Sequence, residues 1–348
     1  MAYTTINKPT EHFNTKLYTG DGTSSNAITG VGFAPDFVWS KARNGANAHI
    51  LVDKVRGATK VLHSSATTAE QTCNANQDTI SLDSDGFTVG TPTQFLGTNT
   101  NGRTVASWNW KANGAGSANT DGDINSTVSA NTTSGFSIVS YTGNATANAT
   151  VGHGLGVAPS MMIVKKTNGA YNWGIYHKSL TAQKLITFTT GTPDDDASYW
   201  NDVEPTSSVF NLGSGALTNG SGSTMIAYCF AEKQGYSKFG SYTGNGNADG
   251  TFVYTGFKPA FIICKITSGT SNWRMFDNKR LGYNVDNNPL YPNVTNVEGT
   301  EDNIDILSNG FKWRTTDGAL NGSGSSYIYM AFAKAPLVGS NNVPCTAR

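Results

Sequence analysis

The sequence predicts an all-β fold of three consecutive antiparallel β-sandwich modules, and three observations lead to this prediction. The chain is rich in glycine, with 39 residues, and in Asn, Thr and Ser, which suit short strands joined by turns and weaken helix interiors. The tripeptide Tyr-Thr-Gly occurs at Tyr18, Tyr141 and Tyr242. Each copy is followed by the same landmarks, and a period of about 100 residues indicates domain-sized units rather than solenoid repeats.

The landmarks of one copy recur in register in the other two. A proline opens an apolar run, a lysine ends it six residues later, and an aspartate or histidine stands eighteen residues after the proline. A phenylalanine then precedes the final aromatic stretch. In chain order these residues are Pro35, Lys41, Asp53 and Phe87 in the first copy, Pro159, Lys165, His177 and Phe210 in the second, and Pro259, Lys265, Asp277 and Phe311 in the third.

The apolar segments of each copy have the pattern of β-strands. The runs that follow the three prolines are largely apolar up to the lysine, which is typical of a central strand covered on both faces. The proline is tolerated there because its missing N–H, at the start of a strand, breaks no ladder bond. The final stretches end at Trp110, Phe230 and Phe332 and alternate in side-chain size. We expect one face of each to pack in its own sandwich and the other against a neighbour.

Turn sequences separate these strands. Asp-Gly and Asn-Gly dipeptides precede Phe87 and Phe311, and nearly identical Asn-Gly-Ser-Gly segments precede the final strands of the second and third copies. Such residues accept the positive φ of tight hairpins. Residues 65–75 are the one weak helix candidate, and we expect a loop there.

The repeats divide the chain. A glycine-rich segment of small polar residues follows the first copy, and we expect it to be extended and solvated, although Ile124 and Val128 could fasten it to a neighbouring surface. The second and third copies have no linker between them, so we expect them to be docked rigidly. The expected layout is an N-terminal arm 1–12, module 1 at 13–114, a polar linker 115–134, module 2 at 135–235, module 3 at 236–336 and a C-terminal tail 337–348.

Composition narrows the classes of function. The chain has 24 basic and 24 acidic residues, only 14% charged residues and no basic run, which argues against a nucleic-acid partner. There is no stretch of 18 apolar residues, so we expect no membrane insertion. The N-terminus lacks the charged and apolar regions of a secretory signal.

No catalytic, cofactor-binding or metal-binding set stands out, and we expect none. The run Asp194–Asp196 is contiguous, which suits a solvated turn better than a calcium loop. His153 lies between glycines without ligands at metal spacing, and His177 fills a slot that aspartate holds elsewhere, so we expect structural roles for both. No Gly-x-Ser-x-Gly segment, nucleotide loop or glycosidase-like carboxylate pair recurs in the copies.

The four cysteines, Cys73, Cys229, Cys264 and Cys345, are far apart in the sequence, which excludes a CxxC site. We expect Cys229 and Cys264, which stand in strand patterns, to be buried free thiols. A disulfide between these two is the alternative.

Tryptophan residues are the candidates for contacts with sugar rings. Trp173 and Trp273 occupy equivalent positions in two copies, which favours a structural role. Trp200 belongs to no repeat landmark. It is therefore our candidate residue for contact with a glycan or a partner. The other two candidates are Trp39 and Trp313.

The Tyr-Thr-Gly openings, the proline–apolar–lysine runs and the closing segment YIYMAFA together resemble virion structural proteins of marine and freshwater phages. Members of this family are tail-fibre-like, with SPRY-like or lectin-like jelly-roll modules, and the resemblance covers essentially the whole chain. It implies a non-enzymatic protein of the virion exterior, made in the host cytoplasm. The implied role is that of a tail fibre or receptor-binding component in host adsorption. The implied partners are other virion proteins and a host surface glycan or protein. The alternatives are a capsid decoration or vertex protein, a lectin, and a glycan-processing enzyme.

We also expect a homo-oligomer. The net charge is zero, charged residues are few, and the final strands carry apolar side chains on both faces. Such surfaces approach one another without desolvating many ions, and the open edge strands of a sandwich invite pairing. The resemblance favours a trimer.

Overall fold

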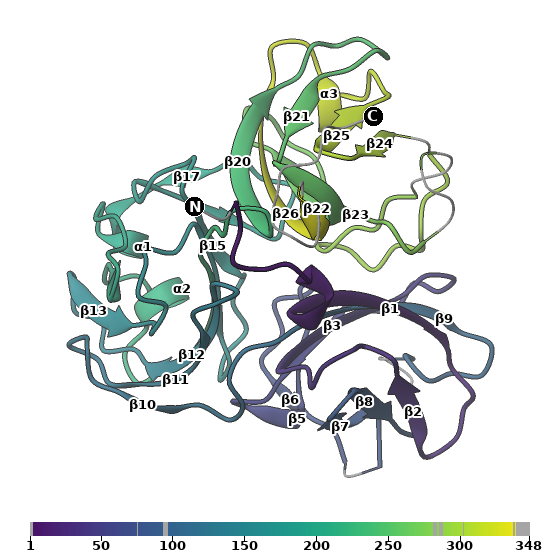
Figure 1. The fold of residues 1–348 in the computed structure, drawn as a ribbon. Helices are drawn as coiled ribbons and strands as arrows, with labels where there is room; N and C mark the ends of the chain where they lie inside the picture. The colour runs from purple at the N-terminus through teal and green to yellow at the C-terminus, as the bar shows by residue number, and fades with distance from the viewer. Residues whose placement is uncertain are drawn as a thin grey trace.

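The strands of the chain form three groups around a common centre, with the N-terminal segment crossing it (Figure 1). This is a computed structural model, and the predicted all-β fold with antiparallel sandwich modules is confirmed. Pairing among the described strands stays within each repeat. The structure describes residues 3–74, 76–92, 97–280, 284, 288–301, 303–336 and 338.

Module 1 pairs a six-stranded sheet, in the order β1-β9-β3-β4-β5-β6, with a three-stranded sheet β2-β8-β7. A 3-10 helix, Pro9–Glu11, leads into it. The large sheet comprises β1 (Phe13–Thr19), β9 (Thr104–Trp110), β3 (Phe37–Ala42), β4 (Ile50–Asp53), β5 (Gly57–Leu62) and β6 (Gln71–Thr72). The small sheet comprises β2 (Asn26–Thr29), β8 (Gly86–Val89) and β7 (Thr79–Asp83).

Module 2 has an eight-stranded sheet, in the order β10-β11-β12-β19-β14-β15-β16-β17, and a two-stranded sheet β13-β18. The large sheet comprises β10 (Ser117–Asn119), β11 (Ser126–Asn131), β12 (Phe136–Thr142), β19 (Thr224–Phe230), β14 (Met161–Lys166), β15 (Gly174–His177), β16 (Lys184–Thr187) and β17 (Asp194–Asp195). The other elements are β13 (Ala149–Gly152), β18 (Val209–Leu212), α1 (Ala197–Trp200) and α2 (Ala216–Asn219).

Module 3 pairs a four-stranded sheet, β20-β26-β22-β23, with a three-stranded sheet β21-β25-β24. The large sheet comprises β20 (Ser237–Thr243), β26 (Ser326–Pro336), β22 (Phe257–Ile266) and β23 (Arg274–Asp277). The small sheet comprises β21 (Phe252–Tyr254), β25 (Gly310–Trp313) and β24 (Ile304–Leu307), and α3 (Gly318–Asn321) precedes the final strand.

The strand registers confirm that the repeat landmarks are equivalent. In module 1 the residue two positions after the proline, Phe37, pairs with Trp110 on one side and with Asp53 on the other. The same three-way pairing joins Met161 with Phe230 and His177, and Phe261 with Phe332 and Asp277. The three prolines are therefore equivalent, each two residues before this three-way pair. Pro35 and Pro159 precede their strands as expected, whereas Pro259 lies within β22, where the register with β26 shifts.

The segment expected to be a solvated linker is part of a sheet, so that expectation was wrong. Strands β10 and β11 extend the large sheet of module 2 by pairing outward from β12. Ile124 and Val128 are buried in the core of module 2, so they hold the segment against a neighbouring surface, which was the alternative expectation. The added strands cover an edge of β12 whose backbone groups would otherwise be unpaired. Equivalent strands β1 and β20 stand at the ends of their sheets.

The central strands of the large sheets are buried on both faces, as the alternating final strands predict. On β19, Tyr228 and Phe230 point into a core shared by all three modules, whereas Ala227 and Cys229 point into the core of module 2 itself. On β26, Phe332 likewise lies in the shared core. The neighbour that covers the second face is therefore another module of the same chain.

In modules 2 and 3 the Tyr-Thr-Gly tripeptide joins its strand, β12 or β20, to the turn before the last strand of the module. The Tyr141 hydroxyl donates to the carbonyl of Thr218 at 2.6 Å. A Cβ atom at Gly143 would lie 2.5 Å from the carbonyl oxygen of Gly220, so only glycine fits there. Module 3 repeats both contacts, with Tyr242 on Leu320 and Gly244 beside Gly322.

Candidate functional site

The aspartate and histidine landmarks lie at the junctions between modules. Asp53 accepts a 2.8 Å hydrogen bond from the Tyr228 hydroxyl of module 2. Asp277 accepts a 3.1 Å bond from the Trp108 indole of module 1. His177 is 3.1 Å from the backbone carbonyl of Tyr329 in module 3. Each module thus reaches the next one through the same position, and the three contacts close a ring.

The partner of this position explains why it holds Asp or His. Asp53 faces Tyr228, which stands two residues before Phe230 on the final strand. The residues at the equivalent position of modules 1 and 3 are Trp108 and Met330. Tyrosine and tryptophan donate to a carboxylate, but methionine has no donor. His177 in that junction bonds to a backbone carbonyl instead.

The protonation of His177 follows from its contacts. The Ser179 N–H donates to Nδ1 at 3.1 Å, which leaves Nε2 to carry the proton and donate to the Tyr329 carbonyl. Burial lowers the pKa of His177 to about 4. The side chain is therefore neutral and cannot accept a proton near neutral pH without losing a contact.

A second ring of junction contacts starts from the residue fourteen positions after each proline. In all three modules an aromatic N–H of this residue reaches a backbone carbonyl of a neighbouring module. The contacts run from His49 to Tyr291 (2.8 Å), from Trp173 to His63 (2.8 Å) and from Trp273 to Thr187 (2.9 Å). His49 is the donor in its contact, because its Nδ1 accepts a hydrogen bond from the Trp39 indole at 2.9 Å and its Nε2 therefore carries the proton.

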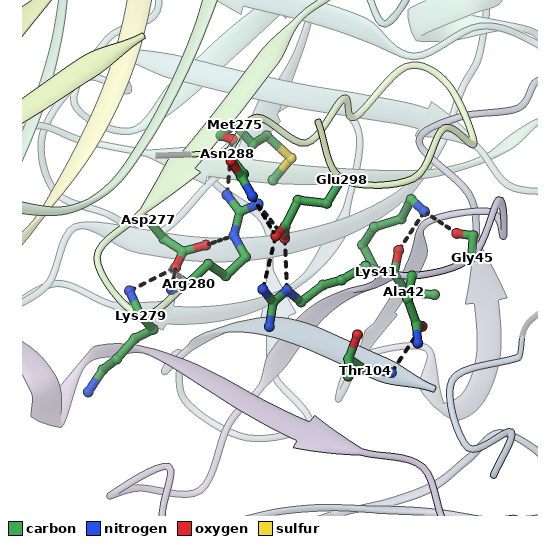
Figure 2. Close-up of polar contacts among 12 residues, drawn as sticks. Lys41, Ala42, Gly45, Thr104, Met275, Asp277, Lys279, Arg280, Asn288 and Glu298 are labelled. Atoms are coloured by element: carbon green, nitrogen blue, oxygen red, sulfur yellow. Dashed lines mark hydrogen bonds and ion pairs between the residues drawn. The ribbon is translucent and has the colours of Figure 1, made fainter. Parts of the chain in front are cut away.

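A charge network joins modules 3 and 1 (Figure 2). Arg280 binds Asp277 at 2.7 Å and Glu298 at 3.0 Å. Arg43 of module 1 donates two hydrogen bonds to the same glutamate, at 2.8 and 2.9 Å. Burial raises the pKa of Glu298, but the bonds from the two arginines outweigh it and hold this pKa below its ordinary value. The network is a structural clamp with an ionised carboxylate.

Module 1 contains an aspartate–arginine ion pair that matches the one between Asp277 and Arg280, and module 2 does not. Arg56 binds Asp53 at 2.6 Å and Glu70 at 3.1 Å. In module 2 the position three residues after His177 is Leu180, which packs against the shared core. These arginines form junction contacts that the sequence analysis missed. The available signal was the spacing Asp-x-x-Arg at 53–56 and 277–280.

The three landmark lysines are fully buried, and two of them cross a module boundary. The Lys165 ammonium donates to the Thr67 carbonyl of module 1 at 2.8 Å, and Lys265 reaches the Thr190 carbonyl of module 2 at 3.4 Å. Lys41 donates to two carbonyl groups of its own module (Figure 2). Burial lowers the pKa of each lysine to about 8.

Trp200, the predicted contact residue, is buried, so the expectation of an exposed ring was wrong. Its exposed fraction is 1%, and its ring packs edge-on against Tyr176 in the core of module 2. Trp200 is the last residue of the short helix α1. Asp196 caps this helix by accepting a hydrogen bond from the Ser198 N–H at 2.7 Å. The remaining candidates are buried as well: Trp39, Trp173, Trp273 and Trp313.

The other candidate residues also have structural contacts. His153 is buried, its Nδ1 accepts from the Leu155 N–H at 3.2 Å, and burial lowers its pKa. In the acidic run, Asp194 accepts from the Tyr199 hydroxyl at 2.9 Å. Within the described residues there is no group of three His, Cys, Asp or Glu side chains that could hold a metal ion.

Cys229 and Cys264 are free thiols in separate cores, those of modules 2 and 3. The disulfide alternative is therefore absent, and burial raises the pKa of each thiol to about 12. Cys73 is also free, and Cys345 lies outside the described residues.

Two of the concave regions among the described residues each combine more than one aromatic ring with polar groups. An axial pocket of about 270 Å³ is lined by residues of all three modules, among them Ser64, Trp173, Thr190 and Asn293. A groove of about 340 Å³ lies where the N-terminal arm meets the connection between modules 2 and 3. Both offer hydroxyl and amide groups beside aromatic rings, which suits binding rather than acid–base chemistry.

Comparison with known proteins places nearly the whole chain in one family. The family model described as "Domain of unknown function (DUF7483)" matches residues 8–336. No curated protein matches the sequence. None of the described helices is long and apolar enough to cross a membrane.

Proposed function

This chain belongs to the family described as a domain of unknown function (DUF7483), so we propose its role from its sequence and architecture. We propose that it is a non-enzymatic phage virion surface protein, namely a tail-associated fibre or receptor-binding component in host adsorption. The observation that carries the proposal is the shared core, in which three sandwiches become one body. A rigid multi-module body with outward loops is suited to contact with a host surface. The resemblance to virion proteins supports the same role and a place on the particle exterior.

The absence of enzymatic activity is part of the proposal. A glycan-processing enzyme needs a carboxyl group whose pKa is raised so that it can donate a proton. Glu298, a clustered carboxylate at a module junction, is instead bound by two arginines that lower its pKa. Asp277 beside it accepts from Arg280 and Trp108.

Two measurements test the role. Electron microscopy of the phage that carries this protein locates its density on the tail or the head. Purified protein added before infection competes for receptor sites, so we expect a concentration-dependent fall in phage adsorption. Density on the inside of the particle, or adsorption unchanged at saturating protein, contradicts the proposal.

A capsid decoration protein is the second candidate, favoured by the ring of junction contacts. Asp53, His177 and Asp277 link three equivalent modules head to tail, so one chain approximates threefold symmetry. Such a body matches a threefold position on a shell. Density at threefold positions of the head would select this candidate over the tail component.

We also propose self-association, with a trimer favoured. The apolar faces of the final strands are used within the chain, so they no longer support it. The remaining support is the zero net charge and the position of β1 and β20 at the ends of the large sheets of modules 1 and 3. The molar mass in solution by light scattering tests it, and a single-chain mass at micromolar concentration contradicts it.

A further inference from the structure

The groove at the N-terminal arm is a preorganised site. Tyr3 crosses from the arm to module 3, where its hydroxyl donates to the Gly256 carbonyl at 2.8 Å. Glycines permit this approach, since a Cβ atom at Gly256 would lie 2.8 Å from the Tyr3 hydroxyl and one at Gly235 would lie 3.3 Å from its ring. Tyr254 forms another wall of the groove.

Aromatic rings are exposed at this place. Within the described part of the chain, the strongly exposed aromatic side chains are Tyr171, Phe252 and Tyr254. The Tyr171 ring is covered by the Lys166 ammonium, 4.6 Å from its centroid. Phe252 and Tyr254 are 43% and 54% exposed and lie on one face of β21, with the groove beside Tyr254. An exposed aromatic face marks a binding surface rather than a packing surface.

The other two modules provide an internal comparison. The central residue of β21, Val253, pairs with the landmark Phe311, just as Ile28 pairs with Phe87 and Val151 with Phe210. This register makes Tyr254 equivalent to Thr29 and Gly152, and Phe252 equivalent to Ala27 and Thr150. Module 3 thus carries two large rings where its sister modules carry small residues. The sandwich does not require the rings, because modules 1 and 2 are built without them.

The residues that line the groove include one acidic and one basic side chain, Glu232 and Lys238, whose charges cancel, and Lys178 stands outside this lining. Glu232 forms ion pairs with Lys238 at 2.7 Å and with Lys178. Burial raises the pKa of Glu232, but the two lysines outweigh it and hold the carboxylate ionised. The exposed Gln234 adds an amide. An aromatic face beside an amide and the Glu232–Lys238 ion pair, whose charges cancel, fits the apolar C–H face and hydroxyl edge of a neutral sugar ring.

We propose that this groove binds a neutral pyranose ring, stacked on Tyr254 and hydrogen-bonded at the Glu232 side. The inference rests on the proposed role in host attachment and names the ligand class of that role. Phe252 extends the aromatic face along β21, so a second sugar unit of the same glycan would contact it. The volume of about 340 Å³ is at the small end of ligand sites, which suits a short glycan segment.

Calorimetric titration tests the site with methyl glycosides of glucose, galactose and mannose and with purified neutral host polysaccharide. We expect saturable binding that Tyr254→Ala weakens by about tenfold or more, because the stacked ring is lost. Tyr254→Phe keeps the ring and should retain most of the affinity. The matched control is Thr29→Ala at the equivalent position of module 1, which should bind like the natural protein. Thermal unfolding confirms that the variants fold.

No saturable binding to any of these probes, or equal binding by Tyr254→Ala, overturns the proposal. A steep loss of affinity between about 0.05 M and about 0.5 M salt would overturn the neutral class, because it indicates an anionic ligand. The adsorption assay separates this site from the wider role. If Tyr254→Ala competes for adsorption as well as the natural protein, the site is wrong and the attachment role stands. If the natural protein binds sugar through Tyr254 but does not compete, the site stands and the attachment role fails.

Discussion

The rings of Phe230 and Phe332, which close equivalent strands of modules 2 and 3, lie 5.9 Å apart at the centre of the molecule. Trp110 from module 1 completes a triangle, 6.2 Å from Phe230 and 5.7 Å from Phe332. All three side chains are buried. The same repeat position of all three modules therefore meets at one point, and the three-module body depends on this contact.

We expect Phe332→Ala to lower the free energy of unfolding by about 3–5 kcal/mol, the range for removing a buried aromatic ring. Phe230→Ala should cost a similar amount, and the double variant should cost less than the sum, because each single change already opens the same cluster. Urea unfolding followed by tryptophan fluorescence measures this. Additive losses, or a separate transition for module 3 alone, would show that the modules do not share one core.

The internal repeat made much of this architecture predictable. The spacing from each proline to its lysine and to its aspartate or histidine is the same in all three copies, so the equivalence of Pro35, Pro159 and Pro259 follows from the sequence. The burial of Trp110 and Phe230 could be predicted from the alternation of the final stretches. What covers their outer face could not, because the pattern of one strand is the same whether the neighbour is another chain or another module.

The contacts at the junctions were harder to predict. Arg43 and Glu298 are 255 residues apart, and no spacing rule connects them. Trp200 was assigned to the surface because it lies outside the repeat, but a residue outside a repeat is also free to fill a local core. The linker strands were missed because Ser, Thr and Asn suit turns, although an unpaired edge of β12 was available to order them.

Stability should rise with pH between about pH 7.5 and about pH 9. Burial lowers the pKa of Lys41, Lys165 and Lys265 to about 8 in the folded chain, from an ordinary value of 10.5. In this window the unfolded chain binds more protons than the folded chain, so raising the pH favours folding. The cysteines, whose ordinary pKa is about 8.5, begin to ionise in the unfolded chain within this window and reduce the slope, and tyrosine adds to this opposition above about pH 9.

Urea unfolding at several pH values measures this slope. The triple variant with methionine at the three lysine positions is the comparison. Its stability should not rise with pH in the same window, because burial raises the pKa of Cys229 and Cys264 to about 12, so only the unfolded chain loses their protons. An equal slope in both proteins would assign the effect to other groups.

The purified protein should release no reducing sugar from host envelope polysaccharide above the buffer control. At the junction of modules 3 and 1, the arginines bind Asp277 and Glu298, and they hold Glu298 ionised, so it cannot serve as a general acid. Sustained release of sugar that Glu298→Gln abolishes, in a variant that keeps its unfolding midpoint, would reverse this assignment.

Tyr228 donates to Asp53. Met330, however, stands at the equivalent position of module 3, and His177 bonds to the Tyr329 carbonyl instead. This difference leads to a test by exchange. His177→Asp places a carboxylate in a buried junction that offers neither the tyrosine donor nor the arginine found in module 1, since Leu180 stands in place of Arg56. We expect a loss of about 3–5 kcal/mol in the free energy of unfolding, the cost of an unpaired buried charge. Adding Met330→Tyr supplies a hydroxyl donor from the position equivalent to Tyr228.

The double variant should therefore recover at least about 1 kcal/mol relative to His177→Asp, a coupling within the range for residues in contact. Met330→Tyr alone should not stabilise the chain, because His177 already uses the backbone carbonyl of Tyr329 and a new hydroxyl finds no acceptor there. A gain of the same size from Met330→Tyr in both backgrounds would mean that the ring merely fills space. A gain confined to the aspartate background would show that the junctions of this chain follow one rule, in which the donor on the final strand selects the acceptor at the end of the neighbouring module's hairpin.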